Sequence, residues 1–301
     1  MTETIAAVIV TYQRTDLLVR CLESLLAQTH PVNSIILVDN NPDEQLKKYL
    51  ENQGYLNSNL YDYLKPDSNI GGAGGFQMGM QRAHEQGFNW IWLIDDDGFL
   101  APDCLAQLLA VRQNYDVIGP VVCQPEQPED LTWGYRRLTR TGFFKPRSHI
   151  ETLQALKEFS IQDCYDGFTN FFNGVLFRRQ VLEDLGYPIK ELFCWGDEVE
   201  YFMRCKKANK KITTAIKAKC YHPKSTDIST PFKFYYRLRN TCYIHFKYHQ
   251  VIYAPLIRYL YPIYILLKSL RDLPSYSPQY LFHLLWAISD AFQGRLRPFS
   301  S

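Results

Sequence analysis

A short apolar run at 90–94 (Trp-Ile-Trp-Leu-Ile) ends abruptly in three aspartates, Asp95, Asp96 and Asp97. An apolar run rich in aromatic and branched side chains is typical of a buried β-strand. Three adjacent carboxylates repel one another, so a cation is needed beside them. Because side chains alternate along a strand, we expect Asp95 and Asp97 to bind a divalent metal while Asp96 points the other way. A solvated strand end, or a cap for the next helix, is the alternative.

A succession of strand and helix occurs four times in the first part of the chain. Strand-like runs at 6–11, 34–38, 60–64 and 90–94 are each followed by apolar residues at helical spacing. This order predicts an α/β fold with a doubly wound sheet, in which ligands bind beyond the carboxyl ends of the strands. The polar residues that fall at those ends are Thr11, Arg14, Asp39, Asn69 and Asp95.

The rest of the chain is less regular. Further strands are expected at 117–122, 168–177 and 212–221, and further helices at 102–114, at 181–185 and from 197 onward. Between them, the segment 123–148 has prolines and scattered basic residues without periodicity. We predict that it is an irregular excursion over the site, with a plain solvated loop as the alternative.

Four glycines, Gly71, Gly72, Gly74 and Gly75, open the helical pattern that follows the third strand. The run lacks the Gly-Lys-Ser/Thr of a Walker loop, and Gln77 stands where a dinucleotide fingerprint needs its third glycine. Small residues at a helix start let backbone N–H groups come close to an anion or a sugar ring. We interpret the run as a ligand-binding helix start, with a flexible connector as the alternative.

A second acidic cluster, Asp197, Glu198 and Glu200, follows Trp195 and Gly196. Asp197 and Glu200 have the spacing of a capping box, and acids in a first turn also favour the helix dipole. That interpretation leaves Glu198 without a role, although a carboxylate at this position is a reasonable general base. We expect a catalytic role for the cluster, with Glu198 ahead of Asp197.

One histidine, His222, follows the strand expected at 212–221 and precedes Pro223. An isolated histidine before proline is more often a loop residue than a ligand. In a chain that already has a carboxylate metal site, a histidine at a late strand end is a credible third ligand. We therefore expect His222 to bind the same metal as Asp95 and Asp97.

Charge is distributed unevenly along the chain. Residues 204–301 contain 17 Lys and Arg against 3 Asp and Glu, although the net charge of the whole chain is only +2. Such a tail suits phosphate-bearing ligands, an anionic membrane or nucleic acid. The eight cysteines show no Cys-x-x-Cys spacing, and the N-terminus lacks the features of a signal peptide. We therefore expect a reducing, cytoplasmic location.

The basic tail is also aromatic. The segment 232–250 could stack nucleobases, but its spacing favours an amphipathic helix. Charged residues and prolines interrupt 251–270 and 273–289 before either reaches the ~20 apolar residues that cross a bilayer. Helices lying on a membrane surface fit better, and packing against the catalytic domain or a second subunit is equally compatible. We expect a homo-oligomer or a peripheral membrane contact, and no nucleic-acid partner.

As a set, these motifs resemble those of family 2 glycosyltransferases of the GT-A fold. The matching segments are 8–14, 38–40, 69–76, 95–97 and 196–201, followed by His222. The glycine-rich segment and the acidic triplet look most like those of bacterial galactofuranosyltransferases, with polymer rhamnosyltransferases close behind. The resemblance implies an α/β fold of the GT-A type, with a doubly wound mixed sheet made of a nucleotide-binding half and an acceptor half. It places this domain at 1–230 and a helical C-terminal appendage at 231–301.

The resemblance also implies roles for individual residues. The nucleotide sugar would contact Thr11, Tyr12, Arg14, Asp39, Asn69, Gly71, Gly72, Gly74, Gly75, Asp95 and Asp96. Asp95, Asp97 and His222 would bind Mn²⁺ or Mg²⁺ at the donor diphosphate. The family usually has an aspartate where this chain has Glu198, which leaves the base open between Asp197 and Glu198.

The implied reaction is a metal-dependent, inverting sugar transfer. The donor would be UDP-galactofuranose, or dTDP-rhamnose in the alternative, and the acceptor a hydroxyl of a bacterial surface polysaccharide or lipid-linked glycan. Transfer needs a base for the acceptor hydroxyl and a cation for the leaving diphosphate. Aromatic walls that exclude water are expected from Trp133, Phe171, Phe172 and Trp195. A sugar nucleotidyltransferase and a non-catalytic nucleotide-binding protein are the remaining alternatives.

Overall fold

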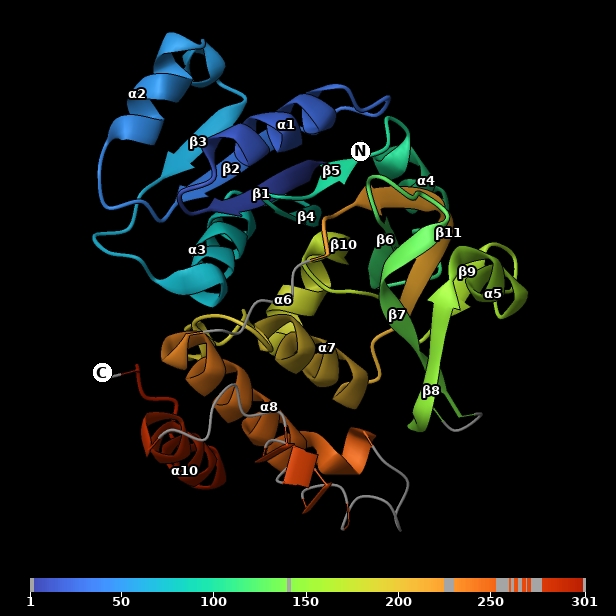
Figure 1. Cartoon of the computed structure of the whole chain (residues 1–301). Helices are drawn as coiled ribbons and strands as arrows, with labels where there is room; N and C mark the ends of the chain where they lie inside the picture. The colour runs from blue at the N-terminus through green and yellow to red at the C-terminus, as the bar shows by residue number, and fades with distance from the viewer. Residues whose placement is uncertain are drawn as a thin grey trace.

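The computed structural model describes residues 3–139, 142–224, 230–252 and 278–299, together with 260, 263–264, 267–268 and 270–271. Within these residues, 11 strands form one central sheet that has helices on both faces (Figure 1). The strands are β1 (Ile5–Thr11), β2 (Ser34–Asp39), β3 (Tyr61–Leu64), β4 (Trp90–Asp95), β5 (Phe99–Leu100), β6 (Val117–Cys123), β7 (Asp130–Leu138), β8 (Phe144–Thr152), β9 (Cys164–Asp166), β10 (Asn173–Arg178) and β11 (Ile212–Tyr221). The helices are α1 (Thr15–Leu26), α2 (Gln45–Asn52), α3 (Gly71–Glu85), α4 (Cys104–Ala110), α5 (Leu153–Glu158), α6 (Arg179–Leu185), α7 (Asp197–Lys207), α8 (Pro231–Ile252) and α10 (Pro278–Phe292), with 3-10 turns η1 (Tyr55–Asn57) and η2 (Lys190–Leu192).

The first part of the chain forms the predicted parallel sheet. The strands β3, β2, β1 and β4 are neighbours in that order, and Val8 on β1 lies opposite Ile36 on β2 and Leu93 on β4. β10 then joins β4 in antiparallel pairing, with Asn173 opposite Ile94. Asn173, the first residue of β10, therefore lies at the same edge of the sheet as the carboxyl end of β4. The sheet continues through β6 and β11 to β5, so it is mixed, as expected.

β1 contributes to two separate layers of the core, because its alternate side chains face opposite sides of the sheet. Val8 and Val10 pack with Phe76 of α3 in a cluster that also contains residues of α6, α7 and α8. Ile9 packs with Leu18 of α1 in a second cluster, which also contains residues of α2 and α4. Burial on both faces explains why the strand is apolar throughout rather than alternating.

Two segments differ from the sequence prediction. The segment 123–148 is not irregular, since it contains most of an antiparallel hairpin of β7 and β8. Tyr135 of β7 is buried and its neighbour Arg136 is exposed, but the two consecutive arginines Arg136 and Arg137 interrupt the apolar–polar alternation in the sequence. In the second segment, β10 begins at Asn173 and not at 168. Phe172 has a φ of 69°, which a continuing strand does not allow.

The aromatic tail packs against the main body of the protein. α8 lies against α7, and its residues Ile244, Tyr248 and Ile252 join the same core cluster as α3 and β1. α10 packs on the first half of α8 through Leu284 and Ala287. The helix expected within 251–270 falls largely outside the described residues. Where the chain is described, no helix has the length and apolar content to cross a membrane.

Candidate active site

Asp95, Asp97 and His222 converge at the carboxyl edge of the sheet. Asp95 ends β4, Asp97 lies in the following turn, and His222 comes directly after β11. Nε2 of His222 is 2.7 Å from Oδ1 of Asp97 and 4.0 Å from Oδ2 of Asp95. β5, which follows the aspartates, pairs with the end of β11, with Leu100 opposite Cys220. This pairing brings together acids and a histidine that are far apart in the sequence.

Asp96 points away from this cluster, as the alternation predicts. Its buried carboxylate accepts hydrogen bonds from Oγ1 of Thr11 at 2.7 Å and from Nη1 of Arg14 at 3.1 Å. The backbone N–H of Tyr12 lies 3.4 Å from the same carboxylate. Arg14 also reaches Oδ2 of Asp97 at 2.7 Å. The ends of β1 and β4 are thus tied together, and Arg14 supplies part of the positive charge that the triplet requires.

The charges in the cluster depend on one another. Burial, together with the charges of Asp97 and Asp96, raises the pKa of Asp95 to about 7. Burial lowers the pKa of His222, but the nearby Asp97 and Asp95 outweigh this effect and leave its pKa raised. Burial raises the pKa of Asp97, but His222 and Arg14 outweigh it and leave its pKa lowered. A divalent cation bound here would replace the protons on Asp95 and His222 and neutralise the repulsion between the carboxylates.

Three features of this cluster fit a divalent cation. The side chains of Asp95, Asp97 and His222 offer ligand atoms that all lie within 4.8 Å of one another. Oδ1 of Asp97 is buried and receives no aligned hydrogen bond from the described residues, although Nε2 of His222 is close. Nδ1 of His222 lies 2.7 Å from the carbonyl oxygen of Pro223, which places the proton on Nδ1 and leaves Nε2 to face the acids. Two carboxylates and an imidazole leave further coordination positions for phosphate oxygens.

The second acidic cluster begins α7, but not as a capping box. Gly196 is the N-cap and no side chain caps the helix, so the predicted pairing of Asp197 with Glu200 is wrong. Asp197 is already the first helical residue, one position too late to cap. Glu200 is fully buried and forms an ion pair with Arg204 at 2.7 Å. Oε2 of Glu198 accepts a hydrogen bond from the N–H of Gly196 at 2.9 Å.

Asp197 and Glu198 form a carboxyl pair in unequal surroundings. Burial, the charge of Glu198 and a hydrogen bond with it raise the pKa of Asp197 well above its ordinary range. Glu198 is only partly buried, and its carboxylate accepts the N–H of Gly196. The charge of Asp95 also raises the pKa of Asp197, so the pair lies near the first cluster. A protonated Asp197 cannot accept a further proton at its carboxyl, so Glu198 is the candidate base of the pair.

Two of the four glycines serve the packing of α3. A Cβ at Gly75 would lie 2.4 Å from Cγ1 of Val10 on β1, and one at Gly74 would lie 2.8 Å from Cβ of Ile70. The run therefore begins a helix, as predicted, and lets that helix approach β1 closely. Packing by itself accounts for the glycine at 75, and contact of Gly74 and Gly75 with a nucleotide sugar stays a prediction.

Gly71 and Gly72 lie at the end of α3 that faces the site. Gly71 is also closely packed, since a Cβ there would lie 2.2 Å from the carbonyl oxygen of Phe193. The N–H of Gly71 donates to Oδ1 of Asn69 at 2.8 Å, and its carbonyl oxygen accepts from Nδ2 of Asn40 at 3.1 Å. A Cβ at Gly72 would meet Oδ2 of Asp197 at 3.9 Å. The start of α3 therefore lies beside the carboxyl pair. The N–H groups of Gly71 and Ala73 are already engaged there, with Oδ1 of Asn69 and with the carbonyl oxygen of Phe193.

Asp39 lies at the expected edge, but its carboxylate is already engaged. Oδ1 accepts hydrogen bonds from the backbone and side chain of Asn41 at 2.8 and 2.7 Å. Oδ2 accepts from the hydroxyl of Tyr63 and lies 3.4 Å from Nζ of Lys65. A nucleoside would have to replace one of these partners. Asn41, which also accepts the N–H of Gln13 at 2.7 Å, was not predicted, although its place just after the strand was a usable signal.

The four aromatic residues expected around an acceptor lie in two kinds of environment. The ring of Trp133 is 4.7 Å from that of His222, and the partly buried Trp195 lies two residues before the start of α7. Phe171 and Phe172 are instead buried in the core, with 2% and 5% of their surface exposed. The turn before β10 directs them inward, so the structure does not place these two on a cleft wall.

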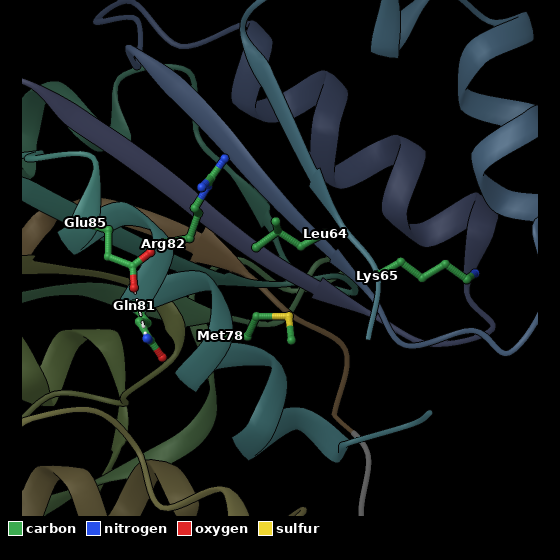
Figure 2. Close-up of a pocket in the computed structure, with 6 residues that line it drawn as sticks. All are labelled: Leu64, Lys65, Met78, Gln81, Arg82 and Glu85. Carbon is green, nitrogen blue, oxygen red and sulfur yellow. Dashed lines mark hydrogen bonds between the residues drawn. The ribbon is translucent and has the colours of Figure 1, made fainter. Parts of the chain in front are cut away.

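An open pocket lies at the β3 edge of the sheet (Figure 2). Its lining residues come from β3, the residue after it, and α3, and they are Leu64, Lys65, Met78, Gln81, Arg82 and Glu85. Nε of Arg82 forms an ion pair with Asp62 at 2.6 Å. β2 and β1 separate β3 from β4, so this pocket is not part of the carboxylate cluster.

Known proteins resemble the chain in sequence over most of its length. Residues 6–186 match the model of the family described as glycosyl transferase family 2. The galactofuranosyltransferase GlfT1 of Mycobacterium tuberculosis (strain CDC 1551 / Oshkosh) is 36% identical over 237 residues, which cover 77% of this chain and 74% of that protein. GlfT1 of Mycolicibacterium smegmatis is 34% identical over 233 residues, covering 76% of this chain and 74% of that protein.

Solved structures resemble the fold. The crystal structure of GalNAc-T7 with UDP, GalNAc and Mn²⁺ matches with a TM-score of 0.64 at 14% identity, over 97% of this chain and 56% of that chain. The crystal structure of S. aureus TarS 1–349 matches with a TM-score of 0.56 at 15% identity, over 97% of this chain and 92% of that one. These matches confirm the fold class predicted from the sequence.

Proposed function

Because the chain belongs to glycosyl transferase family 2, we propose that it transfers galactofuranose from UDP-galactofuranose to a hydroxyl of a growing bacterial surface polysaccharide or lipid-linked glycan. The family match makes the chain a glycosyltransferase of the GT-A fold. The choice of sugar is carried by one observation, the 34–36% identity to proteins named galactofuranosyltransferase over three quarters of the chain.

The cluster of Asp95, Asp97 and His222 supports a site for the donor diphosphate. These residues would hold Mn²⁺ or Mg²⁺, which when bound would neutralise the charge that develops on the leaving diphosphate. Arg14 lies beside the same acids and would add a positive charge there. The start of α3 would approach the sugar and its phosphates with the backbone of Gly72.

In this proposal Glu198 is the general base. The acceptor hydroxyl would give its proton to Glu198 while its oxygen attacks the anomeric carbon from the face opposite the diphosphate. The bond from that carbon to the diphosphate breaks in the same step, so the anomeric configuration is inverted. The raised pKa of Asp197 supports this assignment because a neutral Asp197 is a poor proton acceptor.

A panel of nucleotide sugars tests the donor. The purified protein with Mn²⁺ is incubated with UDP-galactofuranose, UDP-galactopyranose and dTDP-rhamnose, and release of the nucleoside diphosphate is followed. We expect UDP-galactofuranose to be consumed fastest, and NMR of the product to show inversion. If dTDP-rhamnose is consumed faster, it would take the place of UDP-galactofuranose as the assigned donor. No nucleotide release from any sugar, with an acceptor glycan present, would refute the proposal.

We also propose that the C-terminal region touches the anionic inner face of the plasma membrane. Phe282, Leu285 and Phe292 lie on one face of α10 with 62%, 68% and 79% of their surface exposed. The basic excess of residues 204–301 complements anionic lipid. Sedimentation with phosphatidylglycerol vesicles, but not phosphatidylcholine vesicles, is expected, and Phe282→Ser should weaken it. Equal sedimentation with both vesicles, or dimerisation through this face, would contradict the proposal.

A further inference from the structure

The peptide group that joins Trp195 to Gly196 is held on both sides. Its carbonyl oxygen accepts a hydrogen bond from Nδ2 of Asn240 at 2.6 Å. Its N–H donates to Oε2 of Glu198 at 2.9 Å. A trans peptide group is planar, with its C=O and N–H pointing in opposite directions, so fixing the oxygen also fixes the direction of the N–H. Asn240 on α8 is therefore linked to Glu198 on α7 through one rigid peptide group.

The same amide holds the rest of this loop. Nδ2 of Asn240 also lies 2.9 Å from the carbonyl oxygen of Leu192 and 2.9 Å from that of Cys194. The loop needs such support because Phe193 and Trp195 have φ values of 66° and 55°. Side chains with a Cβ disfavour this region, and such residues stay there only when their surroundings hold them.

Arg239 orients the amide of Asn240. Its Nε and Nη2 donate to Oδ1 of Asn240 at 2.9 and 2.7 Å, which leaves Nδ2 to face the loop. The Arg239 side chain is fully buried. Its Nη2 also reaches the carbonyl oxygens of Glu191 and Leu192, and its Nη1 donates to that of Arg297. A buried cation is tolerated only where its donors are used, so these contacts fix the position of Arg239.

We propose that Asn240, oriented by Arg239, is a positioning residue for Glu198. This inference rests on the proposed function, in which Glu198 takes the proton of the acceptor hydroxyl. The N–H of Gly196 holds the carboxylate of Glu198 in one direction. Without the donation from Asn240 the peptide is free to turn, and that hydrogen bond is lost. α8, which lies beyond the 6–186 match to the family, thereby contributes to the site.

Asn240→Asp tests the positioning role of Asn240 most directly. It keeps the size of the side chain and the oxygen that faces Arg239, but replaces the donor by an oxygen facing three carbonyls. We expect kcat to fall about 10- to 100-fold, as for other misplaced catalytic groups, with little change in KM for the nucleotide sugar or in UDP affinity. Asn52→Asp, at the exposed end of α2, makes the same chemical change and should leave activity unaltered.

A second measurement does not depend on activity. The amide resonance of Gly196, followed by ¹⁵N–¹H NMR, is expected downfield in the wild type and upfield in Asn240→Asp, with no shift in Asn52→Asp. If the wild type transfers no sugar but this shift occurs, the proposed function fails while the link from Asn240 to Glu198 stands. An unchanged Gly196 resonance, or an unchanged kcat in a folded Asn240→Asp protein, would overturn the inference.

Arg239→Lys keeps the inference testable if Asn240→Asp does not fold. Lysine retains the charge but cannot donate two bonds in a fixed fork, so a smaller loss of kcat without a change in KM is expected. A loss confined to KM would count against the inference. In the Glu198→Gln background, Asn240→Asp should lower activity no further, because the group it positions is gone. A fully additive loss would show that Asn240 acts by another route.

Discussion

Nε2 of His222 lies 2.7 Å from Oδ1 of Asp97, and this contact joins the end of β11 to the turn after β4. The two atoms belong to opposite halves of the sheet, which meet at β10 and β6. Both are also the atoms that a divalent cation would use. The integrity of the metal site therefore depends on how the two halves of the sheet are placed.

Replacing His222 should abolish the stabilisation of the folded protein by a divalent metal. At a hundredfold excess over its Kd, a ligand of the folded state adds about 2.7 kcal/mol to the free energy of unfolding. We expect Mn²⁺ with UDP to raise the melting temperature of the wild type but not of His222→Ala. The exposed His30 offers a matched control, since His30→Ala should keep the full response. A full response in His222→Ala would mean that the cation binds elsewhere.

Glu198→Gln should abolish most transfer without harming donor binding. Loss of a general base lowers kcat by about 10²- to 10⁴-fold. UDP and Mn²⁺ should bind Glu198→Gln as they bind the wild type, which calorimetry can measure. Asp197→Asn should have a smaller effect on kcat, because its carboxyl is already protonated. The reverse order of the two effects would make Asp197 the base.

The stability of the protein should depend on pH through Asp197. Its pKa is raised in the folded state, so the folded chain keeps a proton that the unfolded chain releases above about pH 4. The free energy of unfolding therefore falls as pH rises, by at most about 1.4 kcal/mol per pH unit. Asparagine does not titrate, so the melting temperature of Asp197→Asn should fall less than that of the wild type between about pH 5 and about pH 8. Asp67→Asn, at an exposed position, should behave as the wild type. Identical pH profiles for Asp197→Asn and the wild type would contradict this expectation.

Gly75→Ala should destabilise the protein, whereas Gly72→Ala should not. The new methyl group at 75 would lie 2.4 Å from Cγ1 of Val10, and overpacking of this kind destabilises a core by about 1–3 kcal/mol. Val10→Ala in the same protein should restore part of the loss. At 72 the nearest atom is 3.9 Å away, so stability should stay unchanged or rise by up to about 1 kcal/mol. Urea unfolding gives the stabilities, and a higher KM for the nucleotide sugar in Gly72→Ala alone would support contact at that position. A stable Gly75→Ala protein would show that α3 can move away from β1.

Local patterns in the sequence were sufficient for most of the fold. Apolar runs and helical spacing depend only on neighbouring residues, and they identified the four parallel strands and the helices between them. The alternation of side chains along a strand likewise predicted that Asp95 and Asp97 share one direction while Asp96 takes the other. The charged hairpin of β7 and β8 was missed, because the consecutive arginines Arg136 and Arg137 interrupt the alternation.

Other features were decided only by the tertiary structure. Glu200 carries no local sign that it is buried, because its burial depends on which elements pack on α7. The hydrogen bonds from Asn240 to the loop before α7 depend on where α8 lies relative to that loop. The sequence by itself determined the elements and the chemical groups at the strand ends. The three-dimensional packing determined which of those groups meet, because a hydrogen bond or an ion pair acts over a few ångströms of space regardless of separation along the chain.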